Sequence, residues 1–210
     1  MSKDQIDQLK NPFTMDINRR QFVTSSLAAG IILPTAMAVA GTASAGAHKA
    51  GGKFRLGMGH GSTTDSLDPG TSENGMSQNV CFAYCNHLTE VSKEGNLIPE
   101  LAVEYGASAD AKTWTFKIRP GVTFHDGKAL TPADVVGSFQ FHMGEDTKSA
   151  GKSLLADVTN IAINGDDVVF TLANASADFA FIVSDYHFPI LPVRDGQLDW
   201  ASGIGTGGYI

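Results

Sequence analysis

The stretch TWTFKIRPGVTFHDGKALTPADVV, Thr113 to Val136, decides the fold. Its first six residues alternate, with Trp, Phe and Ile on one side and polar side chains on the other. That alternation is typical of a β-strand with one buried face. Pro120-Gly121 and Asp126-Gly127 are turn dipeptides. The stretch therefore predicts a strand, two turns and the start of a helix in close succession.

The helix is expected to begin after Thr131. Thr131 is a natural N-cap, Pro132 suits the first helical position, and Asp134 completes a capping box three residues after the cap. Asp134 therefore has a structural task. The apolar side chains that follow recur at helical spacing and form the expected buried face: Val135, Val136, Phe139 and Met143. Gly144 is the expected C-cap.

His125 raises the question of catalysis, because the imidazole could move protons or bind a metal. None of the six histidines stands at H-x-H or H-x-x-x-H spacing, so no metal site is indicated. The glycine-rich end, Gly203–Gly208, lacks the Lys-Ser/Thr pair of a phosphate loop, and no G-x-S-x-G motif is present. We expect no catalytic residue, metal or cofactor, and we interpret the F-H-D-G run as a turn.

The rest of the chain predicts short strands, hairpins and helices. Extended segments are expected over 53–58, 105–108, 113–118, 158–163 and 168–172. A hairpin-like turn at Lys93–Asn96 is expected between short extended pieces within 91–98, and a second hairpin turn is expected at Asn164–Asp167. Short helices are expected over 99–102 and 177–183. A longer helix is expected around one buried apolar stripe made of Met76, Val80, Cys81, Tyr84 and Leu88.

The two cysteines, Cys81 and Cys85, lie four residues apart in that expected helix. Side-chain vectors at this spacing run nearly parallel, which suits a disulfide poorly. A free Cys is often a small buried apolar residue. Export would permit a bridge, so both interpretations stay open, and the core interpretation is favoured.

The first 45 residues have the features of an export signal. Arg19-Arg20 precedes an apolar run, Leu27–Ala40, that is too short to span a membrane. Ala43-Ser44-Ala45 supplies a cleavage site. The paired arginines indicate the twin-arginine route. We expect a signal peptide over 1–45 and a periplasmic protein over 46–210, with no direct membrane anchor.

The charge argues against two kinds of partner. The chain carries 15 Lys and Arg and 22 Asp and Glu residues, and its net charge is −7. Residues 46–210 hold 11 basic and 19 acidic residues, a net charge of −8. No basic stripe exists to neutralise nucleic-acid phosphates or to bind an anionic bilayer. We expect an acidic, soluble monomer.

Several fragments, in order, resemble the dipeptide/oligopeptide/nickel-binding family of periplasmic solute-binding proteins, family 5, which serves ABC importers. The longest is similar to the family's T-F-x-L-R-x-G-V-x-F-H-D-G run. Gly205–Tyr209 resembles a G-T-G-P-Y turn, with Gly208 in the place of proline. The resembling fragments are Ser66–Pro69, His87–Glu90, Gly95–Ala102, Thr113–Gly127, Leu130–Val136 and Gly205–Tyr209.

The resemblance implies the N-terminal lobe of a two-lobed α/β fold, the type II periplasmic-binding-protein fold, with a mixed sheet and β-hairpins. It implies that the F-H-D-G run is scaffold. It also implies capture of a di- or oligopeptide between the lobes and delivery to a permease in the inner membrane. Nickel complexes, haem, sugars and opines are open alternatives. Family members are much longer, so 46–210 is expected to be a truncated first lobe without its second lobe.

The resemblance places the ligand near the loop that follows the L-D-P turn. The expected ligand-binding residues are Thr71, Ser72, Glu73 and Asn74. Backbone N–H groups at the start of the next helix could meet a carboxylate. The alternative is a solvated loop with a helix cap. Two other functions are kept as alternatives: a standalone periplasmic interaction module or non-functional fragment, and an exported hydrolase that uses a Ser with His125 and Asp126.

Overall fold

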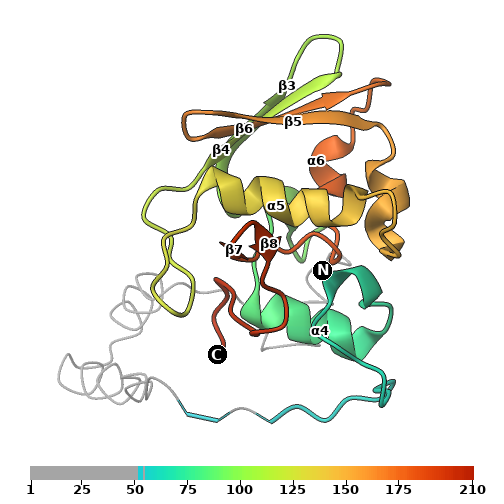
Figure 1. Ribbon diagram of the computed structural model, residues 1–210, viewed down its shortest axis with the longest axis vertical. Coiled ribbons are helices and arrows are strands. Elements are labelled where there is room, and N and C mark those ends of the chain that lie inside the picture. The colour runs from blue at the N-terminus through green and yellow to red at the C-terminus, as the bar shows by residue number, and fades with distance from the viewer. Residues whose placement is uncertain (1–51, 54) are drawn as a thin grey trace, which may run out of the picture. The chain divides into compact units, whose positions relative to one another are not determined.

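The computed structural model describes Gly52, Lys53 and residues 55–210. The chain divides into two compact units, Met1–Leu56 and Gly57–Ile210, and the second contains every helix and strand described below (Figure 1). The expected signal peptide over 1–45 and its cleavage site lie outside the described residues. No helix in the described part of the chain is long and apolar enough to cross a bilayer.

A four-stranded antiparallel sheet with the order β3-β4-β6-β5 forms the framework of the second unit. Its strands are β3 (Ala102–Ala107), β4 (Thr113–Ile118), β5 (Val158–Asn164) and β6 (Asp167–Leu172). Two hairpins build it, and Trp114 of one lies opposite Phe170 of the other. Gly165 has φ 62 and closes the tight β5–β6 turn. The α/β fold with hairpins is confirmed. A mixed sheet was expected, but all pairs of described strands are antiparallel. In the four-stranded sheet, β3–β4 and β5–β6 are hairpins, and the two hairpins join through the antiparallel pair β4–β6.

One face of this sheet is buried beneath helices α5 (Pro132–Met143) and α6 (Phe179–Ile182) (Figure 1). The ring of Phe139 on α5 meets Phe170 edge-on, with ring centroids 4.9 Å apart. Phe179 packs in the same way on Phe116, at 6.3 Å. The buried side chains of the two central strands are Trp114, Phe116, Ile118, Val168, Phe170 and Leu172. The alternation predicted for the first of these strands is confirmed.

The start of α5 is as predicted, and its capping carboxylate also makes longer-range contacts. Asp134 is 1% exposed and accepts hydrogen bonds from the Thr131 N–H (2.9 Å) and hydroxyl (2.7 Å). It also accepts from Lys128 Nζ (2.6 Å) and from the Val193 N–H (2.8 Å). One side chain therefore fixes the helix N-terminus to the preceding turn and to a segment 59 residues further along the chain. Gly144 follows the helix as its C-cap.

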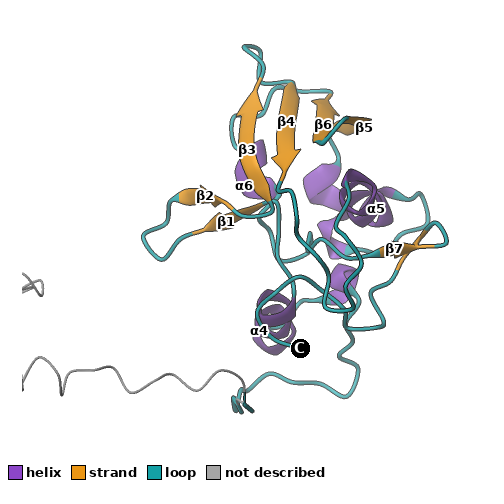
Figure 2. Ribbon diagram, turned by 90° about the vertical axis from the view of Figure 1, so that its left-hand side faces the viewer, coloured by secondary structure: helices purple, strands orange, loops and turns teal. Residues whose placement is uncertain are grey.

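The remaining elements are short. A hairpin of β1 (Thr89–Val91) and β2 (Leu97–Pro99) confirms the predicted turn between them. Figure 2 shows α4 at the end of the unit away from the four-stranded sheet, near the last residues of the chain. The other elements are η1 (Pro69–Thr71), α4 (Gly75–Tyr84), η2 (Ala150–Leu155), β7 (Val193–Arg194) and β8 (Gln197–Leu198).

Two of the predicted elements are wrong. The residues described within 53–58 have no regular structure, because alternation alone does not supply a neighbouring strand to hydrogen-bond with. The predicted helical turn over 99–102 is not helical: Pro99 ends β2, Glu100 and Leu101 form a bend, and Ala102 begins β3. Backbone N–H groups in this segment instead donate hydrogen bonds to the segment before β1. The Leu101 N–H donates to the His87 carbonyl at 3.0 Å.

Folding stability is expected to decrease in mild acid because of His142. This side chain on α5 is buried against Phe188, and its Nδ1 lies 2.6 Å from the Ser149 hydroxyl. Burial lowers the pKa of His142 to about 4, and the charge of His187 adds to the effect. An unfolded His titrates near 6.5, so the unfolded chain binds the extra proton first as the pH falls. The stabilisation that neutral His142 gives to the fold is therefore complete above about pH 6.5 and is lost as the pH falls towards 4.

The expected loss is about 3 kcal/mol, from a shift of about 2.5 pH units. The difference in unfolding free energy between the wild type and His142→Gln should shrink by this amount from pH 7 to pH 4 in urea titrations. If the wild type and His142→Gln differed by the same unfolding free energy at pH 7 and pH 4, the lowered pKa of His142 would be contradicted.

Candidate functional site

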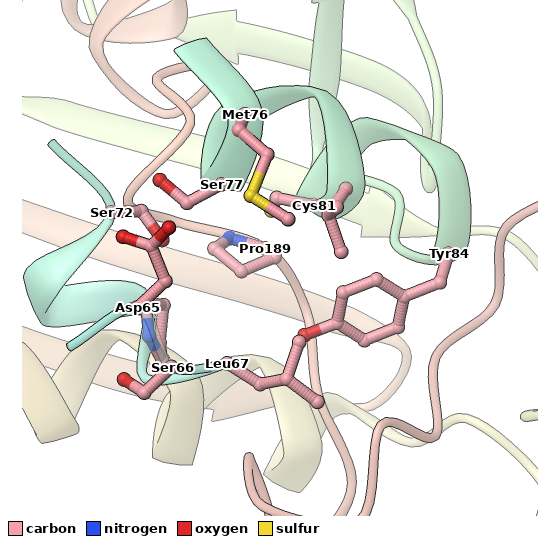
Figure 3. Close-up of a pocket in the computed structure, with 11 residues that line it drawn as sticks. Asp65, Ser66, Leu67, Ser72, Met76, Ser77, Cys81, Tyr84 and Pro189 are labelled. Carbon is pink, nitrogen blue, oxygen red and sulfur yellow. The ribbon is translucent and has the colours of Figure 1, made fainter. Parts of the chain in front are cut away.

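A cavity of about 180 Å³ lies between α4, the loop that precedes it and Pro189 (Figure 3). Its polar end carries Asp65, Ser66, Ser72 and Ser77. The rest of its wall is apolar or aromatic, made chiefly of Leu67, Met76, Val80, Tyr84 and Pro189. Complete sites for small ligands occupy roughly 300–1,000 Å³. This cavity is therefore large enough for one side chain of a solute.

The loop that forms the polar end is held in shape by Asn74. Its side-chain oxygen accepts from the N–H groups of Met76 and Ser77, both at 3.0 Å, and so caps α4. Its side-chain nitrogen donates to Asp65 Oδ1 at 2.7 Å. The other oxygen of Asp65 accepts from the Ser62 N–H at 2.6 Å. The cap of the helix and the rim of the cavity are thus one hydrogen-bonded structure.

The apolar stripe predicted for α4 is only partly buried. Met76 and Val80 keep 36% and 37% of their surface exposed and line the cavity. The helix ends at Tyr84, so Leu88 lies outside it. Cys81, on the adjacent face, is buried. Periodicity identified one apolar face correctly, but it could not show that much of this face borders a cavity and not the core.

The four predicted ligand-binding residues lie in different surroundings. Ser72 is buried and lines the cavity. Thr71 is exposed at the end of η1, and its hydroxyl donates to the Asp68 carbonyl within the loop. Glu73 is exposed and lies 3.4 Å from His187 Nε2. Asn74 serves as the helix cap. The structure therefore brings only the Ser72 side chain into the wall of the cavity.

Several cavity residues were missed by the sequence interpretation. Asp65 and Leu67 flank the start of the L-D-P turn, which was noted as a family motif and not as a ligand contact. Pro189 lies more than 100 residues further along the chain, and no local pattern connects it with α4. Within the described residues, no cation lies at ion-pair distance from Asp65. Burial raises the pKa of Tyr84, so its phenol stays protonated and able to donate.

His125 fastens the glycine-rich segment at the C-terminal end of the chain. The backbone N–H of His125 donates to the Gly205 carbonyl at 2.9 Å. On the imidazole ring, Nδ1 accepts from the Gly205 N–H at 3.2 Å, and Nε2 donates to the Gly207 carbonyl at 2.9 Å. The Gly207 N–H in turn donates to the Tyr84 carbonyl at the end of α4 (2.9 Å). Both ring nitrogens are therefore used on backbone groups.

The pair His125 and Asp126 does not form a catalytic dyad. The Asp126 carboxylate accepts from Arg194 and from the Lys128 N–H. Those bonds lower the pKa of Asp126, the Lys128 bond having the larger effect. Across residues 52, 53 and 55–210, no three His, Cys, Asp or Glu side chains are grouped to hold a metal ion. The F-H-D-G run acts here as a structural connection between the turn, the C-terminal segment and α4.

Residues 96–210 match the model of the bacterial extracellular solute-binding proteins, family 5 (middle). The chain is 43% identical over 75 residues to the glutathione-binding protein GsiB of Pectobacterium atrosepticum. It is 28% identical over 159 residues to the "Probable peptide ABC transporter periplasmic-binding protein y4tO" of Sinorhizobium fredii. These matches cover 36% and 76% of this chain, but only 15% and 28% of the relatives.

Solved structures agree with these matches. AppA from Bacillus subtilis, in complex with a nonapeptide, has a TM-score of 0.60 at 25% identity, over 67% of this chain and 30% of AppA. AgaA in complex with agropinic acid, from A. tumefacien R10, has a TM-score of 0.61 at 26% identity, over 68% of this chain and 30% of AgaA.

The family match covers more than half of the chain, and its members are solute-binding proteins and not enzymes. The type II periplasmic-binding-protein fold of the solved relatives confirms the predicted fold class. The chain belongs to family 5 of the bacterial extracellular solute-binding proteins.

Proposed function

We propose that this chain is part of the substrate-binding component of an ABC importer, which captures di- or oligopeptides and delivers them to a membrane permease. The cavity beside α4 is one wall of the peptide site in this proposal. The observation that carries it is the position of the cavity. The L-D-P turn and Ser72 of the loop that follows it lie at its rim, and the first helix forms much of its apolar wall, which is where the family resemblance places the ligand.

The names of the relatives support peptides over the other solutes. GsiB is a glutathione-binding protein, y4tO is named for peptide transport, and AppA holds a nonapeptide. AgaA, in complex with agropinic acid, shows that the fold also takes other solutes. The chain spans less than a third of these relatives, so the choice of peptide is an inference from their names and from the chemistry of the cavity.

That chemistry suits a peptide. An apolar side chain of the solute would lie against Met76, Val80 and Pro189. The amide N–H groups or the amino terminus of the peptide would face the carboxylate of Asp65 and the hydroxyl of Ser72. Hydrogen bonds to a charged acceptor are the stronger ones, so Asp65 would fix the orientation of the solute.

The same proposal includes export. The Arg19-Arg20 pair, the apolar run and the Ala43-Ser44-Ala45 site would direct the chain to the periplasm, with cleavage near Ala45. The description of the family as extracellular supports this destination. The net charge of −8 over 46–210 fits a soluble receptor that reaches its permease by diffusion.

We expect short peptides with an apolar side chain to raise the melting temperature of the purified chain. Ligand at one hundred times its Kd adds about 2.7 kcal/mol of stability. Met76→Ala should weaken binding roughly tenfold, because about 1.5 kcal/mol of apolar contact is lost. Met58→Ala is the matched control, since Met58 is also exposed but does not line the cavity. Equal weakening by both substitutions, or no response to any peptide, would contradict the proposal.

A further inference from the structure

The imidazole of His187 is buried between two carboxylates, one from its own segment and one from the loop before α4. Its Nδ1 lies 2.7 Å from Oδ1 of Asp185, and its Nε2 lies 3.4 Å from Oε1 of Glu73. The side chain of His187 is 6% exposed, and among the residues that the structure describes its Nε2 has no well-aligned hydrogen bond. A buried polar atom without a partner is costly, so this arrangement calls for an explanation.

The protonation state of the ring supplies that explanation. A carboxylate only accepts hydrogen bonds, so the close contact with Asp185 assigns a proton to Nδ1. A neutral imidazole carries one N–H, and its Nε2 would then turn a lone pair towards the Glu73 carboxylate, which places two acceptors 3.4 Å apart. An imidazolium carries an N–H on both nitrogens and attracts both carboxylates. The contacts therefore fit the charged ring and not the neutral one.

These contacts join two segments that both contribute to the cavity beside α4. Glu73 follows Ser72, and His187 stands two residues before Pro189; Ser72 and Pro189 both lie in the wall of the cavity (Figure 3). The Glu73 N–H donates to the Thr71 carbonyl at 2.9 Å, so the position of Glu73 is coupled to the fold of its loop. An ion pair between Glu73 and His187 thus ties this loop to the segment that carries Pro189.

We propose that His187 is a proton-dependent latch on the loop before α4. As an imidazolium it ties Glu73, and with it the loop that carries Ser72, to the segment of Asp185. As a neutral ring it releases Glu73, and the loop gains freedom to move. The side chain of Glu73 is 62% exposed, so it can turn to solvent once the attraction is lost. This device goes beyond the proposed transport role and does not depend on the identity of the solute.

Other titratable groups surround the ring. They are Cys81 of α4, His87 before β1, His142 of α5 and Tyr186 beside it. The Cys81 thiol donates to the Tyr186 carbonyl at 3.6 Å, and the Tyr186 ring packs on His187 with centroids 4.1 Å apart. Burial keeps His142 neutral, and the charge of His187 adds to this effect. From η2 the uncharged Gly151 packs against His187. Glu73 and Asp185 are therefore the charges that decide its protonation.

The acidity of His187 agrees with the latch. Burial alone would lower the pKa of His187, but the hydrogen bond and charge of Asp185, with those of Glu73, outweigh burial and raise the pKa. Burial alone would raise the pKa of Asp185, but the hydrogen bonds from His187 lower it, so Asp185 stays ionised. An unfolded His titrates near 6.5, so the folded chain keeps this proton to higher pH. The stabilisation is complete below about 6.5 and is lost as the pH rises through the folded pKa of His187.

The test is a pH titration of the imidazole ¹⁵N signals of the full-length chain by NMR. In the wild type, His187 should titrate above about 6.5, with both ring nitrogens protonated below its midpoint. Glu73→Gln keeps the shape of the side chain and removes its charge, so it should lower the pKa of His187. Glu104→Gln is the matched control, because this glutamate is exposed on β3 and does not contact His187; the pKa should stay unchanged.

Release of the loop has its own readout, the hydrogen-exchange rate of the Glu73 amide. Below the His187 midpoint, this amide should exchange roughly two- to fivefold more slowly in the wild type than in His187→Gln, the effect expected of a partly exposed ion pair. Above the midpoint the two rates should converge. The titration with Glu73→Gln stands even where His187→Gln fails to fold, because Glu73 is exposed.

Three results would overturn the proposal. The first is a His187 that titrates at or below about 6.5 in the folded wild type. The second is an equal effect of Glu73→Gln and Glu104→Gln on the pKa of His187. The third is a Glu73 amide whose exchange rate, relative to that in His187→Gln, is the same on both sides of the midpoint.

Discussion

Replacing Gly207 with alanine is expected to destabilise the chain by about 3 kcal/mol, the upper part of the range for overpacking a close contact. A Cβ atom at Gly207 would lie 2.6 Å from the carbonyl carbon of Tyr84 and 2.9 Å from the Cys85 nitrogen. These are backbone atoms at the end of α4, and no side-chain rotation relieves the clash. The C-terminal segment would have to leave α4, and its bonds to His125 and Tyr84 would be lost with it.

Gly208→Ala provides the control for this prediction. A Cβ atom added at this neighbouring glycine would have no atom within 4 Å, so the substitution should change stability by less than about 0.5 kcal/mol. Urea unfolding of both variants, followed by circular dichroism, measures the difference. Equal stability of Gly207→Ala and Gly208→Ala would show that the glycine-rich segment does not pack on α4 as described. Gly208 stands where the resembling motif has proline, which agrees with the open space at that position.

Replacing Asp134 with alanine is expected to cost about 3 kcal/mol, because a buried N–H group left without its acceptor costs roughly 1–3 kcal/mol and a lost helix cap about 1 kcal/mol. The substitution removes the acceptor for two backbone N–H groups, from Thr131 and Val193, and leaves the Lys128 ammonium without its carboxylate. The start of α5 and the segment that leads to β7 would both lose their anchor. Asp146→Ala is the matched control, because this aspartate is exposed and should contribute less than about 0.5 kcal/mol.

The pH dependence of this loss gives a second check. Burial alone would raise the pKa of Asp134, but the hydrogen bonds from Lys128, Val193 and Thr131 outweigh it and lower the pKa. An acid with a depressed pKa in the folded state stabilises the fold above its unfolded value, near 3.9, and loses that contribution as the pH falls through the folded value. The stability gap between wild type and Asp134→Ala should therefore narrow below about pH 4. A gap that is small at pH 7, or independent of pH, would contradict the role assigned to Asp134.

Local patterns predicted the features that depend on local interactions. The alternation of Trp114 and Phe116, the glycine turn at Gly165 and the cap at Thr131 are each determined within a few residues, and each was predicted correctly. The prediction of a helical turn over 99–102 was wrong because the backbone there forms tertiary hydrogen bonds to the segment before β1. Helix propensity has little influence on the local structure where a neighbouring backbone segment offers such hydrogen bonds.

The cavity could be predicted only in part, because its walls come from distant parts of the chain. The loop that holds Ser72 was identified through a family resemblance, and Ser72 lies in the wall. The apolar positions on α4 were also found, but they were assigned to the core. Nothing in the sequence near Pro189 indicates that it closes the same cavity. His125 shows the same limit, since its partners Gly205 and Gly207 lie about 80 residues further along the chain.

The alternative functions make different predictions from the proposed one. An exported hydrolase would need the His125 ring free to act, whereas both of its nitrogens bond to backbone groups of the C-terminal segment. A standalone interaction module would leave the cavity beside α4 without a solute. The decisive difference is therefore whether a peptide enters that cavity.

The most direct test uses the methionine methyl groups as reporters. Met76 lines the cavity, whereas Met143 packs against the main core, so one lies at the proposed site and the other is an internal reference. NMR spectra of the chain labelled with ¹³C at the methionine methyl groups would be followed during titration with short apolar peptides. A saturable shift of the Met76 signal with a stationary Met143 signal is predicted. Binding that leaves the Met76 signal in place, or no binding by any peptide, would contradict the assignment of this cavity as the wall of a peptide site.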